Sequence, residues 1–155
     1  MATTALDAIY TAINGLNTNF STDSTLTVHT WNYTQLDGSK QPACPQRVLS
    51  CSGQLEGGMG FIALGKLTSI DWVIVDTLLL KPALEGDSLK ENSANIVKYI
   101  DAYVAAVRGL RAPSSQSHIT DIKFEPGVYY WPDDTSGTPY IGVKTTLTIQ
   151  EVISG

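Results

Sequence analysis

LTSIDWVIVDTLLL, residues Leu67 to Leu80, is the longest strand candidate in the chain, and the other elements must be arranged around it. Most of its residues are β-branched, aliphatic or aromatic, and they partly alternate, which is typical of a strand. One face carries Ile70, Trp72, Ile74 and Asp76. The other face carries Asp71, Val73, Val75 and Thr77. Apolar residues on both faces predict either the central strand of a sheet or a strand with one face covered by a partner.

The segment before this strand is rich in glycine and resembles two nucleotide-binding motifs. Residues 58–63 (GMGFIA) fit the dinucleotide fingerprint, with alanine in the third position. Residues 60–66 (GFIALGK) fit a P-loop, but Leu67 stands where a Ser or Thr would hold magnesium. A P-loop must follow a buried strand and open a helix. Here residues 50–57 (SCSGQLEG) are not a hydrophobic strand, and a strand follows the motif, so both motifs have the wrong context.

Residues 52–66 are therefore interpreted as an insertion in the domain. Several glycines raise the entropy cost of ordering this segment, yet apolar residues lie between them. A flexible and apolar segment is typical of an arm that becomes ordered against a partner. The alternative is a long β-hairpin with an irregular tip. If the segment is an arm, its assembly-interface residues are Leu55, Met59, Phe61, Ile62 and Leu64.

The first part of the chain predicts a helix and two strands. Residues 3–20 carry an apolar stripe at helical spacing, with Thr3 or Thr4 as the cap. This helix docks on a sheet or also packs on a neighbouring subunit. Residues 25–33 alternate as a strand, and 46–51 form a short strand that directs Arg47 toward water.

The second part predicts a helix followed by two long strands. Ser88 to Glu91 has the form of a capping box, and an apolar stripe follows as far as Val107. Pro113 and a polar linker end this helix. Residues 119–131 and 140–153 are the last two strands, joined by a turn-rich connection.

These elements predict one α+β domain over residues 1–155: a mainly antiparallel sheet with two helices on one face, plus the Gly-rich hairpin or arm. A chain of 155 residues with 43% hydrophobic residues is long enough to bury one core. Its net charge of −5 disfavours specific nucleic-acid binding. Neither a signal peptide nor a membrane span is expected.

The chain offers no evident site for catalysis, a metal or a cofactor. His29 and His118 are isolated, so we expect no metal site. Cys44 and Cys51 are expected to be reduced, although a disulfide is not excluded by their spacing. No serine lies in a G-x-S-x-G elbow, and the paired carboxylates Asp133 and Asp134 lie in a turn-rich segment. We therefore predict that the protein is not an enzyme.

The whole pattern resembles the tail-terminator and tail-completion proteins at the neck of long-tailed bacteriophages. The resemblance covers nearly the whole chain and rests on the order of its elements. It is carried by Leu6–Tyr10, Trp31–Tyr33, Pro45, Arg47–Leu49, Trp72–Val75, Ile96–Arg108, Tyr140, Gly142, Val143 and Leu147–Ile149.

The resemblance implies a virion structural protein, assembled in the host cytoplasm. Such proteins form a ring, typically hexameric, that caps the tail tube and joins it to the head connector. The implied partners are further copies of the chain, the tail-tube protein and a head-connector or head-completion protein. Alternatives are a head-closure or tail-tube subunit, or a nucleotide-binding enzyme that uses residues 58–68. Neither the ring size nor the exact position in the neck follows from the sequence.

Overall fold

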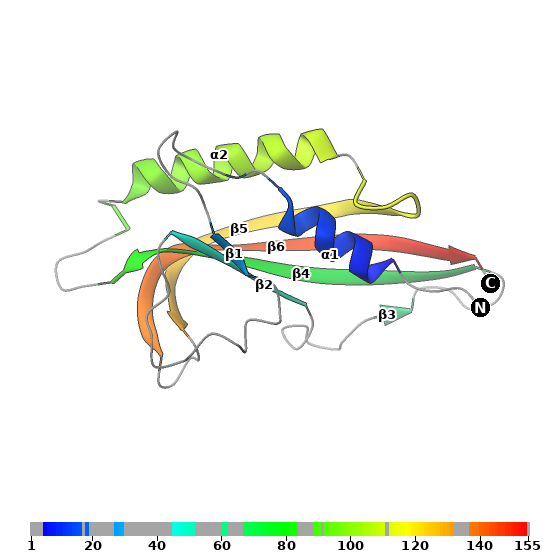
Figure 1. The fold of residues 1–155 in the computed structure, drawn as a ribbon, viewed down its shortest axis with the longest axis horizontal. Coiled ribbons are helices and arrows are strands. Elements are labelled where there is room, and N and C mark those ends of the chain that lie inside the picture. Colours follow the sequence, from blue (N-terminus) through cyan, green and yellow to red (C-terminus); the bar gives the residue numbers. More distant parts are fainter. Residues whose placement is uncertain are drawn as a thin grey trace.

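The computed structural model describes residues 5–16, 18, 27–29, 45–51, 60–61, 67–83, 89–90, 92–110, 112–131 and 137–154. Two helices and six strands lie in these ranges (Figure 1). In chain order they are α1 (Leu6–Asn14), β1 (Thr27–His29), β2 (Gln46–Cys51), β3 (Gly60–Phe61), β4 (Leu67–Pro82), α2 (Ser93–Leu110), β5 (Ser117–Trp131) and β6 (Thr138–Ser154).

The strands form one sheet in the order β1-β2-β4-β6-β5, and β3 also pairs with β4. All pairings are antiparallel except that of β1 with β2. Both helices contribute residues to one hydrophobic core on one face of this sheet (Figure 1). The predicted α+β class, mainly antiparallel sheet with two helices on one face, is confirmed.

The central place of β4 explains why its sequence is apolar on both faces. On the helix side it buries Ile70, Trp72, Ile74 and Leu78, as the alternation predicts. The facing residues of β6 are the odd-numbered ones, and they complete this layer of the core. Those buried against the helices are Ile141, Val143, Leu147 and Ile149.

Helix α1 is shorter than predicted but buries the predicted stripe. Ile9, Tyr10 and Ile13 are buried, with Leu6 and Leu16 partly buried beside them. The spacing of three and four residues places these side chains on one side of the helix. Its N-cap residue is Ala5, which makes no side-chain capping hydrogen bond. The caps predicted at positions 3 and 4 lie outside the described residues.

Helix α2 begins later than its sequence signal predicts. Leu89 and Lys90 form a turn, and the helix starts at Ser93, so the predicted start at Ser88 is wrong. The Ser93 hydroxyl donates a hydrogen bond to the Lys90 carbonyl at 2.8 Å. Beyond this start, Ile96, Tyr99 and Tyr103 of α2 are buried in the core, and Ile100, Val107 and Leu110 pack against it partly buried.

The sheet bends sharply at the end where β5 and β6 curl away from α2 (Figure 1). The register of β4 on β6 shifts between Leu79 and Lys81. At this point Gly142 lies so close to β4 that a Cβ atom would be 1.8 Å from the Leu78 carbonyl oxygen. Only glycine fits there. A second small cluster, Val48, Leu79 and Tyr140 with Tyr129 packed against it, stabilises the opposite face.

Strand β3 follows β2 along the same edge of β4. Cys51 pairs with Ile74, and Gly60 pairs with Asp71. Eight residues, 52–59, separate β2 from β3 in the sequence. The residues of β4 with which these two strand ends pair, Ile74 and Asp71, are separated only by residues 72 and 73. The predicted insertion therefore begins directly after β2, at residue 52.

Candidate functional site

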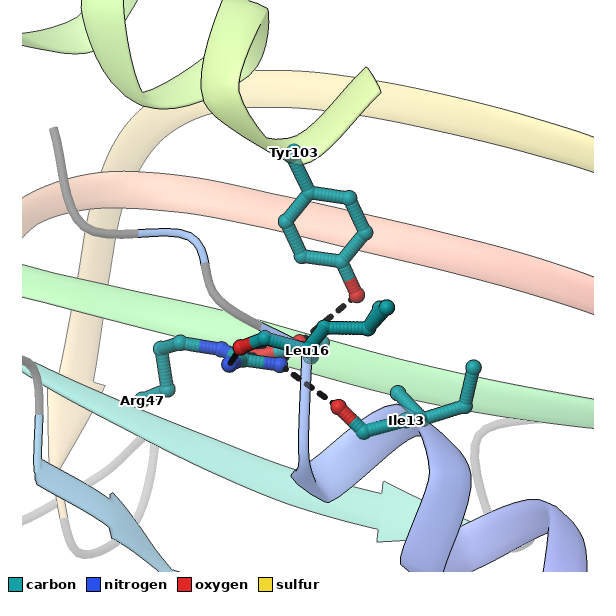
Figure 2. Close-up of polar contacts among 5 residues, drawn as sticks. Ile13, Leu16, Arg47 and Tyr103 are labelled. Atoms are coloured by element: carbon teal, nitrogen blue, oxygen red, sulfur yellow. Dashed lines mark hydrogen bonds and ion pairs between the residues drawn. The ribbon is translucent and has the colours of Figure 1, made fainter. Parts of the chain in front are cut away.

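A cluster of buried polar contacts lies between α1, α2 and the sheet, where Arg47 binds Asp76. Figure 2 shows Arg47 with Tyr103 of α2 and with Ile13 and Leu16 at the end of α1. Arg47 comes from β2 and Asp76 from β4, and both side chains are fully buried. Arg47 Nε donates to both carboxylate oxygens, at 3.2 Å to Oδ1 and 3.1 Å to Oδ2. Arg47 Nη2 also contacts Oδ2. The guanidinium thus binds the carboxylate through Nε and Nη2, an arrangement that the planar fork of arginine donors favours.

The same guanidinium also binds the end of helix α1. Arg47 Nη2 donates to the Ile13 carbonyl at 3.1 Å, and Nη1 donates to the Leu16 carbonyl at 3.0 Å (Figure 2). The last carbonyls of a helix have no partner within the helix and carry partial negative charge. Arg47 complements the helix dipole by binding the Ile13 carbonyl, which also accepts a hydrogen bond from the Leu16 amide, and the Leu16 carbonyl just beyond the helix.

Two tyrosines of α2 complete the cluster. Tyr103 donates its hydroxyl hydrogen to Asp76 Oδ2 at 2.7 Å, and its ring centroid lies 5.5 Å from Arg47 Cζ. Tyr99 and Phe124 each pack edge-on against the Tyr103 ring, both with centroids 5.7 Å away. Asp76 thereby joins α2 to the sheet, and Arg47, which binds Asp76, joins both to the end of α1.

The electrostatics fix the protonation states of this cluster. Burial alone would lower the pKa of Arg47, but the charge of Asp76 and its hydrogen bonds outweigh burial and hold that pKa above its ordinary value. Burial, followed by the Asp76 charge, raises the pKa values of Tyr99 and Tyr103 well above 10.0. At neutral pH the cluster therefore holds a cationic arginine and two neutral tyrosines.

A second buried charge lies at the other end of α1. Glu151 of β6 is fully buried, and it accepts hydrogen bonds from the Trp72 indole nitrogen and the Ala5 amide, both at 2.6 Å. Ala5 is the N-cap residue of α1. A carboxylate at a helix N-terminus matches the positive end of the helix dipole. Helix α1 is thus held at both ends by a buried charge of the favourable sign.

This arrangement is suited to holding a helix. Arg47, Asp76 and Glu151 are each 0% exposed, and each makes hydrogen bonds to other groups of the chain. In the described ranges, no group of three His, Cys, Asp or Glu side chains is placed to hold a metal ion. No described helix is long and apolar enough to cross a membrane.

Sequence reasoning missed this cluster because it placed Arg47 on the solvent side of its strand. That prediction is wrong: β2 is buried on both faces, with Gln46, Val48 and Leu49 also buried. A signal was available in Asp76, which the alternation places among the apolar residues of β4. An acid on an apolar face requires a partner, and Arg47 was an available one.

The predicted assembly residues lie mostly beyond the described ranges. Leu55, Met59, Ile62 and Leu64 fall outside them, and Phe61 is described only as a backbone partner of Ile70 in the β3–β4 pair. The expectation that the nucleotide-like motifs lead into a strand is confirmed, because β4 begins at residue 67. A P-loop would require a helix at that place.

The remaining candidates are scattered over the sheet. Asp71 and Asp76 lie on opposite faces of β4, as predicted, and Asp71 pairs with Gln150. His118 is an exposed residue of β5. Asp133 and Asp134 lie outside the described residues.

No protein-family model matches the chain, and no curated protein matches its sequence.

Proposed function

We propose that this protein is a structural subunit of the neck of a long-tailed bacteriophage, and specifically a tail terminator. In this proposal it forms a ring, hexameric as in the family that it resembles, on the last ring of the tail tube. The ring ends tube growth and joins the tube to the head connector. The protein acts in the virion after assembly in the host cytoplasm, without a cofactor and without catalysis.

The observation that carries the proposal is the order of the elements. The resemblance rests on a helix, a strand pair, an insertion, a long strand, a helix and two closing antiparallel strands. The fold has α1, the β1–β2 pair, the insertion around β3, β4, α2 and the β5–β6 pair in that order. The agreement covers both long strands that close the sheet, and it supports the proposal without depending on any single motif.

The use of the buried charges also supports a structural role. Arg47 and Glu151 are engaged with the ends of α1. The two sides of the sheet differ as well, because the insertion departs from the β2–β3 side of β4, whereas β5 forms the opposite edge. A closed ring requires two different contact patches on each subunit, and the two sides of this sheet offer such a pair.

Electron microscopy of the purified protein, alone and mixed with tail tubes of the phage that encodes it, tests the proposal. Closed rings that cap the tube ends are expected. Deletion of residues 54–64 should leave the circular dichroism spectrum intact and abolish capping, because these residues supply the neighbour contact in the proposal. Capping that persists in the deletion variant would remove the insertion from the interface. Species no larger than a dimer, with and without tubes, would contradict the ring itself.

The same images separate the alternatives. Long polymers of the purified chain would indicate a tail-tube subunit, and rings that bind the head connector but not the tube would indicate a head-closure protein. Calorimetric titration with Mg-ATP and with NAD tests the enzyme alternative. Clear binding that is lost in Lys66→Ala would favour a nucleotide site over the neck function.

A further inference from the structure

Strand β5 is the edge of the sheet and one of its longest strands. It pairs with β6 from Ser117, opposite Glu151, to Trp131, opposite Thr138. Among the described strands, β6 is its only neighbour. The other side of β5 therefore presents backbone N–H and C=O groups that can pair with a further strand.

Pro126 shows which backbone groups face this free edge. A proline has no amide hydrogen, so in a paired strand its nitrogen is tolerated where it points away from the neighbouring strand. Pro126 pairs with Val143 in an unbroken stretch of the β5–β6 ladder, so its nitrogen points to the free edge. Because backbone groups alternate between the two sides of an antiparallel strand, the same edge presents the N–H and C=O groups of Ile122, Phe124 and Val128.

We propose that this edge pairs, antiparallel and about a two-fold axis, with the β5 edge of a second copy of the chain, with Phe124 at the centre. In this register Lys123 of each copy lies directly opposite Glu125 of the other copy. Lys123 and Glu125 are solvent-exposed, at 66% and 41% of their side-chain surface, and form an ion pair at 3.4 Å within one chain. Oppositely charged residues directly across two strands stabilise the pairing, and symmetry supplies this cross-strand pair twice.

The charged side chains favour this register over the two registers that are shifted by one residue. If the axis passed through Lys123, the two lysines would face each other, and Asp121 would face Glu125. If it passed through Glu125, the two glutamates would face each other. Like charges directly opposite one another are destabilising, so both of these registers are disfavoured.

The bulge in β5 disfavours a register centred on Ile122, and the bulge and Pro126 together limit the length of the contact. Centring the pair on Ile122 would again oppose unlike charges, but it would require pairing through Thr120, the extra residue of the bulge between Ile119 and Asp121. The proposed register uses residues 121–127, which are clear of the bulge. Pro126 removes one donor on each side, so the contact is short and reversible.

Such a contact differs from the one that a ring requires. A two-fold contact uses the same patch on both subunits and closes at two copies, whereas a ring needs head-to-tail contacts. The dimer would occupy the β5 side of the sheet that the proposed ring also uses, so the two contacts are alternatives, and the dimer is tested on the free protein without tail tubes.

Sedimentation velocity over a range of protein concentrations, at low salt, tests the pairing. The wild-type chain should show a reversible monomer–dimer equilibrium that weakens as salt is added. Lys123→Glu and Glu125→Lys should each weaken the dimer about tenfold or more, because each puts like charges opposite one another twice. The double variant Lys123→Glu/Glu125→Lys should regain most of the wild-type affinity, since it restores both pairs with the charges exchanged.

The matched control is Lys98→Glu on α2, an exposed site where the same change of charge should leave the dimer unaffected. The decisive result is weakening in both single variants followed by recovery in the double variant. The two single variants shift the net charge in opposite directions, so an effect of net charge alone would weaken only one of them. A wild-type chain that stays monomeric at every attainable concentration would overturn the proposal. So would a dimer that is insensitive to the single reversals, or one that the double reversal does not restore.

Discussion

Replacing Arg47 with methionine should destabilise the protein more than almost any other single change to its charged residues. Methionine keeps much of the apolar stem but removes the guanidinium. Asp76 would then be a buried carboxylate that keeps the hydrogen bond from the Tyr103 hydroxyl but has lost its countercharge. The carbonyls of Ile13 and Leu16 would also lose the donors that arginine supplies.

The size of the effect follows from these contacts. Removing one partner of a buried ion pair costs about 3–5 kcal/mol, because the other charge stays buried without compensation. Loss of the two hydrogen bonds to α1 acts in the same direction, although the two terms are not additive. A domain of this kind has a total stability of about 5–15 kcal/mol, so the variant should lose a large fraction of it. The melting temperature should fall by roughly 10 °C.

A double-mutant cycle with Asp76→Leu separates the charge effect from simple loss of packing. Replacing both members of a buried ion pair with apolar side chains is far less costly than removing one. The variant Arg47→Met/Asp76→Leu should therefore be more stable than the sum of the single changes predicts, by about 2 kcal/mol. Urea unfolding, followed by circular dichroism and tryptophan fluorescence, gives each free energy of unfolding.

Two results would refute this reasoning. One is a cost below about 1 kcal/mol for Arg47→Met, which would mean that water or a rearrangement compensates Asp76. The other is strict additivity in the cycle, which would mean that the two side chains are not coupled. Lys98→Met, at an exposed position of α2, is the control and should leave the unfolding midpoint unchanged.

Three further predictions concern the other parts of the fold. Glu151→Gln should lower the free energy of unfolding by about 1–2 kcal/mol in urea titrations and alter the emission of Trp72, because the buried acceptor loses its charge. Gly142→Ala should cost about 3 kcal/mol or more in the same assay, since the new methyl group would overlap a β4 carbonyl that cannot move aside. Alkaline pH should unfold the protein: the pKa values of Tyr99 and Tyr103 are raised in the folded state, so the unfolded state releases these protons first. Stability should be constant below the unfolded tyrosine pKa, near 10, and fall above it, and the melting temperature measured between pH 8 and 12 checks this.

The strands of this protein could be predicted from the sequence because their patterns are local. Alternation located β5 and β6 to within two residues at each end, and the apolar character of residues 67–80 indicated the central strand. The start of α2 was predicted too early because a capping-box pattern at Ser88 takes no account of the tertiary contacts that decide where a helix begins.

The buried charges could be predicted only in part because their partners are distant in the chain. Alternation placed Asp76 on the same face as Ile70, Trp72 and Ile74, but its partner Arg47 lies 29 positions away, and Glu151 binds the Ala5 amide across 146 positions. Local periodicity carries no information on such pairs. Arg47 was therefore placed by the average preference of charged residues for water, which does not hold for a buried charge that has a partner.

These long-range charges also explain how a short helix acquires a defined position. An isolated helix as short as α1 is marginal in water, and its stripe of Ile9, Tyr10 and Ile13 could contact an apolar sheet in more than one orientation. The negative charge of Glu151 at the N-terminus of α1 and the positive charge of Arg47 at its C-terminal end favour a single direction of the helix dipole. Sliding α1 by one turn would separate Glu151 from the first amide and Arg47 from the last carbonyls. The net stability contributed by such buried charges is often small, so their principal effect here is on the direction and register of α1.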